Sequence, residues 1–240
     1  MTRVAIITGA AGGLGRSCAE KFAQEGTIVA LVDADPEALD KTAGALDADG
    51  VGVVAHEADL RTREACAEVV ARTVSEFGRV DVLVNAAGVY PRRPALDISA
   101  DDWQHVFQVN VLGTYFMMVE AIAEMRTGGS IVNISSVDGF KAHPDNAHYA
   151  ATKAAVISLT RSLALEAAPL GIRVNSVAPG PMATEAAKLT EWYGPMVEEL
   201  PTGSPIEPSE VAELVFYLSR AENVSIAGEN IVVSGGGVIV

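Results

Sequence analysis

A tyrosine and a lysine stand four residues apart in the segment Tyr149-Ala150-Ala151-Thr152-Lys153. On a helix, residues at this spacing share one face, so the ammonium of Lys153 would lie beside the phenol of Tyr149. Free tyrosine has a pKa of about 10, and a neighbouring positive charge favours the phenolate. The pair could therefore carry a proton to or from a substrate oxygen. An isolated Y-x-x-x-K is also the pattern of an ordinary exposed helix pair, so the rest of the chain must decide.

Short β-branched runs alternate with longer helical patterns along the whole chain. The expected strands cover residues 4–7, 28–32, 52–55, 82–84, 130–134, 173–177 and 231–233. The expected helices cover residues 14–25, 36–46, 63–77, 101–125, 148–168 and 209–219. Strands that are apolar on both faces suit a parallel sheet buried between helices. We therefore predict one α/β domain over residues 1–240, with a doubly wound parallel sheet and helices on both faces.

The alternation stops between Pro179 and Pro208, a stretch that contains six prolines. It also contains the aromatic pair Trp192-Tyr193 and no clear strand. Long irregular segments inside compact domains are usually functional. We expect a substrate lid at about residues 182–208; the alternative is a surface excursion that only packs against the domain.

A glycine-rich turn, Thr8-Gly9-Ala10-Ala11-Gly12-Gly13-Leu14-Gly15, follows the first expected strand and opens a helix. Glycines at such a turn let the backbone approach a pyrophosphate, which binds free N–H groups at the helix N-terminus. The spacing of Gly9, Gly13 and Gly15 is G-x-x-x-G-x-G, which differs from the common G-x-G-x-x-G fingerprint. The turn indicates a dinucleotide site.

Asp33 ends the second expected strand, eighteen residues beyond Gly15. A carboxylate there can accept hydrogen bonds from the adenosine ribose hydroxyls and would repel a 2′-phosphate, which favours NAD over NADP. Neither Gly12 nor Ala34 supplies a positive charge for that phosphate. Asp33 could instead cap the next helix, although Asp35 before Pro36 fits that role better.

With these residues assembled, nearly the whole chain resembles the short-chain dehydrogenase/reductase family. The matching motifs are the turn Thr8 to Gly15, Asp59-Leu60, Asn85-Ala86-Ala87-Gly88, Asn110, Ser136 thirteen residues before Tyr149, the YAATK segment, and Pro179-Gly180 with Thr184. Three positions depart from the family pattern: Ala86 replaces an asparagine, Thr152 a serine, and Ser234 an aspartate before two glycines.

The resemblance implies a Rossmann-type α/β/α fold and a set of site residues. The implied catalytic residues are Asn110, Ser136, Tyr149 and Lys153. The implied cofactor-binding residues are Gly9, Gly13, Leu14, Gly15, Asp33, Asp59, Leu60, Asn85, Ala86, Gly88, Tyr149, Lys153, Pro179, Gly180 and Thr184. Tyr149 would be the general acid/base with its pKa lowered by Lys153, Ser136 would bind the substrate oxygen, and Asn110 would steady a water next to Lys153.

The composition and net charge of the chain limit the kinds of molecule that it is expected to bind. The chain carries a formal charge of −14, which argues against nucleic acid and anionic membranes as partners. Cys18, Cys66 and the four histidines match no metal-binding spacing, so we expect no metal. No apolar run approaches the roughly eighteen residues that span a bilayer, and the chain enters a strand at once, so we expect a cytoplasmic protein.

The sequence leaves the substrate and the assembly open. Tyr90, Phe140, Met182, Trp192 and Tyr193 could line a substrate slot or pack beneath the lid, and Arg92, Arg93 and Lys141 could attract an anion or merely solvate a loop. We expect an NAD-dependent enzyme that interconverts a secondary alcohol and its ketone. The alternatives are a 3-oxoacyl-(acyl carrier protein) reductase and a non-catalytic NAD-binding sensor. The resemblance also implies a homotetramer or homodimer, and the apolar face of Val156, Leu159 and Leu163 suits either core or interface.

Overall fold

The structure is a computed structural model that describes residues 2–47, 50, 52–125 and 128–239. Within these residues, seven parallel strands form one sheet in the order β3-β2-β1-β4-β5-β6-β7. The strands are β1 (Val4–Thr8), β2 (Ile28–Asp33), β3 (Val53–Glu57), β4 (Val82–Asn85), β5 (Gly129–Ile134), β6 (Ile172–Pro179) and β7 (Asn230–Val233). Every predicted strand and the doubly wound parallel sheet are confirmed.

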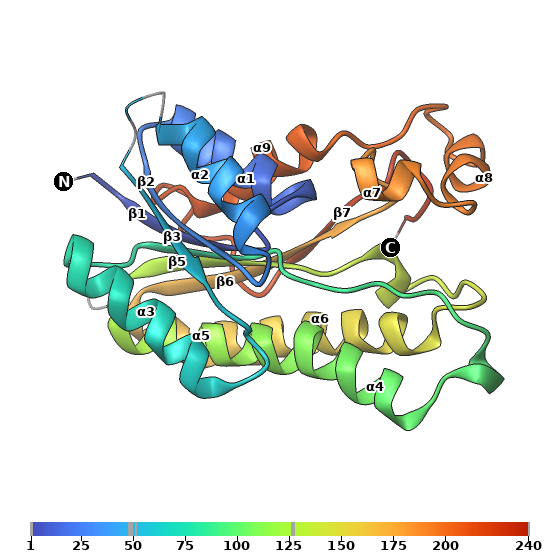
Figure 1. Cartoon of the computed structure of the whole chain (residues 1–240), viewed down its shortest axis with the longest axis horizontal. Coiled ribbons are helices and arrows are strands. Elements are labelled where there is room, and N and C mark those ends of the chain that lie inside the picture. Colours follow the sequence, from blue (N-terminus) through green and yellow to red (C-terminus); the bar gives the residue numbers. More distant parts are fainter. Residues whose placement is uncertain (1, 48–49, 51, 126–127, 240) are drawn as a thin grey trace.

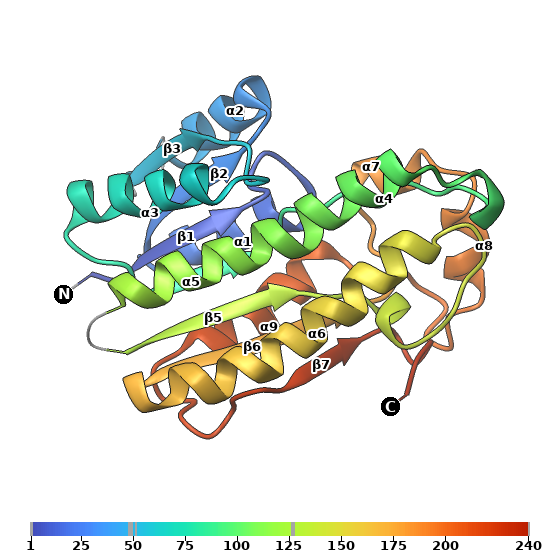
Figure 2. The same ribbon diagram turned by 90° about the horizontal axis from the view of Figure 1, so that it is seen from below.

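Helices cover both faces of this sheet (Figures 1 and 2). One face carries α1 (Gly13–Gln24), α2 (Pro36–Asp47) and α9 (Pro208–Ser219). The other carries α3 (Arg63–Phe77), α4 (Ala100–Phe107), α5 (Thr114–Glu124) and α6 (Ala147–Ala167). Two short helices, α7 (Glu185–Lys188) and α8 (Tyr193–Glu198), lie beyond the carboxyl ends of the strands.

Alternating strand residues divide the core into two layers, one on each side of the sheet. In β1, Ala5 and Ile7 pack with Phe22 of α1, while Ile6 packs with Met117 and the other helix layer. Successive strand side chains point to opposite faces, so a strand buried on both sides must be apolar throughout. This apolar pattern explains why the strands could be predicted from the sequence.

The sheet reverses its strand order beside β1. After β1 the chain builds β2 and β3 on one side, then crosses to β4 on the other side of β1. The loops that leave β1 and β4 therefore diverge, and a crevice opens between them at the carboxyl ends of the strands. That crevice is where an α/β sheet places its ligand.

The predicted helix at 101–125 is interrupted. Ser99 caps α4 with a capping box to Asp102, and Gln108–Gly113 forms a π-helical segment before α5 begins. Contrary to the sequence expectation, the described helix Ala100–Glu124 is long and apolar enough to cross a membrane by length and composition alone. Here it is a core helix, because Met117, Met118 and Ala121 are fully buried.

The expected lid, at about residues 182–208, is a segment whose two ends are joined by backbone contacts. The Met182 and Ile206 backbones form an isolated parallel bridge, and Ala183 N–H donates to the Ile206 carbonyl at 2.8 Å. Between these residues lie α7 and α8, and Ala187 of α7 and Leu200 after α8 are buried. The segment therefore stands over the carboxyl ends of the strands and is anchored on β6.

Candidate active site

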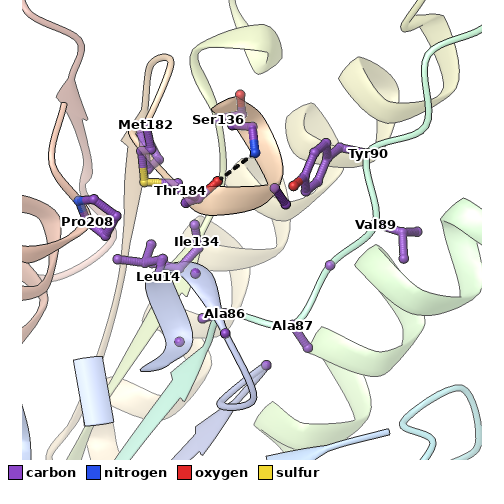
Figure 3. A pocket seen from close by; sticks show the side chains of 18 of the residues that line it. Leu14, Ala86, Ala87, Val89, Tyr90, Ile134, Ser136, Met182, Thr184 and Pro208 are labelled. Atoms are coloured by element: carbon purple, nitrogen blue, oxygen red, sulfur yellow. Dashed lines mark hydrogen bonds between the residues drawn. The ribbon is translucent and has the colours of Figure 1, made fainter. Parts of the chain in front are cut away.

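A cleft of about 1140 Å³ opens at the crevice beside β1 and β4. Figure 3 shows that its lining comes from segments far apart in sequence, with Leu14 from α1, Ala86 and Ala87 after β4, Ser136 after β5, and Met182 and Thr184 after β6. Tyr149 and Lys153 of α6 also line it. The fold thus brings most of the predicted site residues to one cavity.

The glycine turn needs its glycines for close backbone approach. Gly9 has φ 69°, and a Cβ on it would lie 2.8 Å from the backbone of Ala87 after β4. A Cβ on Gly15 would lie 2.0 Å from the Gly9 carbonyl oxygen. The turn therefore folds tightly against the first turn of α1. Gly12 is the N-cap of this helix and supplies no side-chain hydrogen bond, which leaves N–H groups free for an anion.

Asp33 stands at the end of β2 and faces this turn. Its carboxylate accepts hydrogen bonds from the backbone N–H groups of Ala11 at 2.9 Å and Ala34 at 2.8 Å. Asp35 instead accepts from Ala38 N–H at 3.1 Å and caps α2, as the sequence favoured. Asp33 is therefore held at the cleft wall, where the ribose of a bound dinucleotide would lie.

Tyr149 and Ser136 meet across the cleft. The Ser136 hydroxyl lies close enough to the Tyr149 phenol to act on its pKa. Burial raises the pKa of Tyr149 above its usual value, while Ser136 and the charge of Arg92 lower it. The sequence expectation of a lowered pKa is wrong for the polypeptide alone, since burial outweighs the charges that face the phenol.

Lys153 lies beneath the tyrosine ring. Its Nζ is 5.6 Å from the centroid of the Tyr149 ring and donates to the Ile134 carbonyl at 2.8 Å. The side chain is 5% exposed, and burial lowers its pKa to about 8. The groups whose charges shift the Tyr149 pKa include Asp138 and Arg92, and Lys153 is not among them.

The comparisons with known proteins agree with this geometry. Residues 9–237 match a family model described as "Enoyl-(Acyl carrier protein) reductase". The chain is 36% identical to meso-2,3-butanediol dehydrogenase of Serratia marcescens, over 98% of this chain and 94% of that protein. It is also 36% identical to 3-oxoacyl-[acyl-carrier-protein] reductase FabG of Thermotoga maritima, over 99% of this chain and 98% of that protein. A solved short-chain dehydrogenase/reductase from Serratia marcescens superposes with a TM-score of 0.94 at 31% identity, covering 98% of this chain and 97% of that one.

The chain belongs to the short-chain dehydrogenase/reductase family. Membership explains why the glycine turn, the Ser136–Tyr149 pair and Lys153 converge on a single cleft. It also makes the chain an oxidoreductase of a family that acts on CH–OH groups.

In this short-chain dehydrogenase/reductase, Asn110 lies in the π-helical segment and connects the loop after β4 to α6. Its side-chain amide accepts from Val89 N–H at 2.9 Å and donates to the Val89 carbonyl at 2.9 Å and to the Thr152 hydroxyl at 3.1 Å. A Cβ on Gly88 would lie 3.3 Å from Asn110 Oδ1 and 3.6 Å from Lys153 Nζ. Asn110 is thus beside Lys153 but turned toward the backbone after β4.

Thr152 has a role that sequence reasoning missed. Its hydroxyl donates to the Tyr149 carbonyl at 2.7 Å and accepts from Asn110. It therefore links the first turn of α6 to the π-helical segment. The family serine at this position was the available signal, because a serine would offer the same hydroxyl.

The remaining predicted cofactor residues fall into two groups. Asp59, Leu60, Ala86, Gly88, Pro179, Gly180 and Thr184 line the cleft. Thr184 lies across from the turn, with its Cγ2 3.6 Å from a Cβ built on Gly13. Asn85 is a correction, because its side-chain amide donates to Asn133 Oδ1 at 2.9 Å inside the sheet and does not face the cleft.

Proposed function

We propose that this short-chain dehydrogenase/reductase interconverts a secondary alcohol and its ketone with NAD. The observation that carries the proposal is that Ser136, Tyr149 and the buried Lys153 line the same cleft as the glycine turn. An alcohol oxygen between the two hydroxyls would find both a proton carrier and a hydrogen-bond donor.

The residues then divide the chemistry. Bound nicotinamide would accept the hydride from the alcohol carbon, or donate it to the ketone. Tyr149 takes the proton of the alcohol, or returns it to the ketone oxygen, and Ser136 donates a hydrogen bond to that oxygen as negative charge develops. Lys153 would hold the nicotinamide ribose hydroxyls through its ammonium.

NAD rather than NADP is supported by the charges around the ribose site. Asp33 faces the glycine turn, and its carboxylate would repel a 2′-phosphate. Two arginines line the cleft near the turn, but Arg16 pairs with Glu20 at 2.8 Å and Arg61 pairs with Asp59. The guanidinium groups of Arg16 and Arg61 therefore already have carboxylate partners and are not available to bind a 2′-phosphate.

Asp33→Ala tests this cofactor choice, with Asp35→Ala as the matched control. We expect D33A to lose much of its preference for NADH over NADPH, since the repelling carboxylate is gone. D35A removes only the α2 cap, which is worth about 1 kcal/mol of stability, and should keep the preference. The ratio of kcat/KM for the two cofactors is the measurement, and an unchanged ratio in D33A would refute the role of Asp33.

A 3-oxoacyl-(acyl carrier protein) reductase is the second candidate. The similarity to FabG of Thermotoga maritima favours it. Asp33 and the formal charge of −14 speak against it, because that role is associated with NADPH and with a basic face for an acidic carrier. A non-catalytic NAD sensor is disfavoured by the retention of Ser136, Tyr149 and Lys153.

The oligomeric state and the cellular location of the protein are part of the same proposal. We propose a cytoplasmic homotetramer or homodimer that acts on small molecules and neither nucleic acid nor membrane. Val156 and Leu163 are buried within the chain, so they belong to its own core. The apolar side chains available to a partner on these helices are Tyr115 of α5, 37% exposed, and Leu165 of α6, 80% exposed.

The proposal is tested by a panel of secondary alcohols and ketones, each assayed with both nicotinamides by absorbance of the reduced cofactor. The panel includes 2,3-butanediol, acetoin and an acetoacetyl thioester. We expect turnover of small alcohols with NAD. Faster reduction of the thioester with NADPH than of any ketone with NADH would favour the acyl-carrier role instead.

A further inference from the structure

Arg92 and Arg93 are neighbours in sequence but occupy different environments. Arg92 lines the cleft together with Tyr90 and Tyr149 and is half-buried. Arg93 is exposed, and its guanidinium lies 3.7 Å from the Asp102 carboxylate. From the sequence, the two arginines were grouped into one basic cluster. In the structure, Arg92 lines the cleft and Arg93 does not.

Arg92 differs from the other basic side chains of the cleft in its partners. Among the described lining residues, Arg16, Arg61 and Lys188 each pair with a carboxylate, and Lys153 donates to a backbone carbonyl. The guanidinium carbon of Arg92 lies 4.7 Å from the ring centroid of Trp192, and its Nη2 lies 3.4 Å from the sulfur of Met196. A guanidinium held by an aromatic ring and a thioether keeps in-plane N–H groups available for a planar anion.

The position of Arg92 relative to the reacting group limits what that anion can be. The positive charge of Arg92 lowers the pKa of Tyr149, which means that the guanidinium lies close enough to the phenol to interact with it electrostatically. Tyr90, two residues before Arg92, packs edge-on to Tyr149 with ring centroids 6.4 Å apart. An anion on Arg92 and a hydroxyl on Tyr149 could therefore belong to one small molecule.

The anion should carry a single charge. Asp138 also lines the cleft, and its carboxylate is bound by His143 Nδ1 at 2.7 Å and Asn146 Nδ2 at 2.8 Å. One guanidinium in a cleft that also holds the Asp138 carboxylate matches a monoanion better than a dianion such as a phosphate. A carboxylate also matches the planar N–H fork of arginine.

We propose that Arg92, held by Trp192 of the lid, binds the carboxylate of a hydroxy-acid or keto-acid substrate. This inference rests on the proposed function and narrows its substrate class. Because Trp192 and Met196 belong to the lid segment, the anion site would be shared between that segment and the loop after β4. A bound carboxylate would then hold the lid against the domain.

The kinetic test compares acids with matched neutral amides. 3-Hydroxybutyrate and 3-hydroxybutanamide, with their longer homologues, are assayed on the wild type, R92Q, R92K and the control R93Q. A hydrogen-bonded charge pair is worth about 10- to 100-fold. We expect the wild type to prefer an acid over its amide by that factor in kcat/KM, R92Q to lose the preference, R92K to keep part of it, and R93Q to keep all of it. An acid-to-amide ratio that R92Q leaves unchanged would overturn the inference.

A binding test separates this inference from the proposed function. In a W103F variant, Trp192 is the one remaining tryptophan. We expect butyrate, but not butyramide, to change Trp192 fluorescence, and the effect to vanish in W103F/R92Q. If butyrate binds in this way while no alcohol is oxidised, the anion site stands and the proposed reaction fails. If alcohols are oxidised but butyrate leaves the fluorescence unchanged, the reaction stands and the anion site is wrong.

Discussion

At the scale of single residues, the site depends on two buried titratable groups with opposite preferences. Burial raises the pKa of Tyr149 and lowers the pKa of Lys153 to about 8. The lysine is nevertheless kept beneath the ring, bonded to the Ile134 carbonyl. A buried ammonium costs stability, so we infer that it is retained for its function.

The stability cost of Lys153 is measurable as a pH dependence. Its pKa is lowered from 10.5 in the unfolded chain to about 8 in the fold. Between these values the unfolded chain binds more protons, so the cost is fully present below pH 8 and declines as the pH rises. We expect Lys153→Met to be more stable than the wild type at pH 7, with the difference shrinking by roughly 2 kcal/mol by pH 10.

Urea unfolding of the two proteins from pH 7 to pH 10 measures this difference. The unfolded tyrosine titrates only near pH 10 and is common to both proteins. A difference that stays constant across the range would mean that Lys153 is not charged and buried in the fold.

Sequence reasoning predicted which residues form the site better than it predicted their electrostatics. The family resemblance implied Ser136, Tyr149 and Lys153 as site residues, and all three line one cleft because they lie at the end of β5 and on α6. The direction of the Tyr149 pKa could not be predicted, since it depends on how much of the ring is buried. The separation of Arg92 from Arg93 also depends on tertiary contacts.

At the scale of elements, the contact between the glycine turn and α1 organises the cofactor side of the cleft. The Gly15 Cα lies so close to the Gly9 carbonyl that a Cβ would be 2.0 Å from its oxygen. By contrast, a Cβ on Gly44 in α2 would meet nothing within 4 Å. Two helical glycines therefore have opposite requirements.

Gly15→Ala and Gly44→Ala form a matched pair of variants. We expect G15A to push α1 away from the turn and to lose most of its affinity for NADH. G44A should be neutral or stabilised by up to about 1 kcal/mol, because alanine is the better helix former. Thermal unfolding and NADH fluorescence titration measure both effects, and equal NADH affinity in the two variants would contradict this account of the turn.

Element boundaries were predicted where local signals exist. The helix expected to start at residue 101 starts at Ala100, directly after its N-cap Ser99. The π-helical segment Gln108–Gly113 was missed, because its residues continue the same apolar helical pattern. Its cause is tertiary, since Asn110 there binds the Val89 backbone and Thr152.

At the scale of the whole molecule, the parallel sheet determines where the site lies, and α5 and α6 cover one of its faces with Tyr115 and Leu165 exposed. The parallel sheet with helices on both faces follows from alternating strands and helices with right-handed crossovers, and it was predicted for that reason. The outward side chains of α5 and α6 were not assigned by the sequence, which could not separate core from surface on α6. Leu165 of α6 is 80% exposed, while Leu163 is buried.

Leu165→Glu tests whether this face joins copies of the chain, with Leu96→Glu as the control. Leu96 is fully exposed on the short helix η1 (Ala95–Asp97), which is a different element from α6. We expect light scattering to give the wild type and L96E two or four times the chain mass of 25.0 kDa. L165E should shift toward the monomer because a charge would be buried at the contact. An unchanged mass in L165E would exclude this face.

The central claim is that the Tyr149 phenol transfers the proton, and Tyr149→Phe tests it most directly. The substitution keeps the ring that packs on Tyr90 and Lys153 and removes only the hydroxyl. Loss of a general acid/base lowers turnover by about 10²- to 10⁴-fold. We therefore expect kcat for the best alcohol of the panel to fall by that factor in Y149F, while the fluorescence titration gives an unchanged Kd for NADH. Wild-type turnover in Y149F would contradict the account.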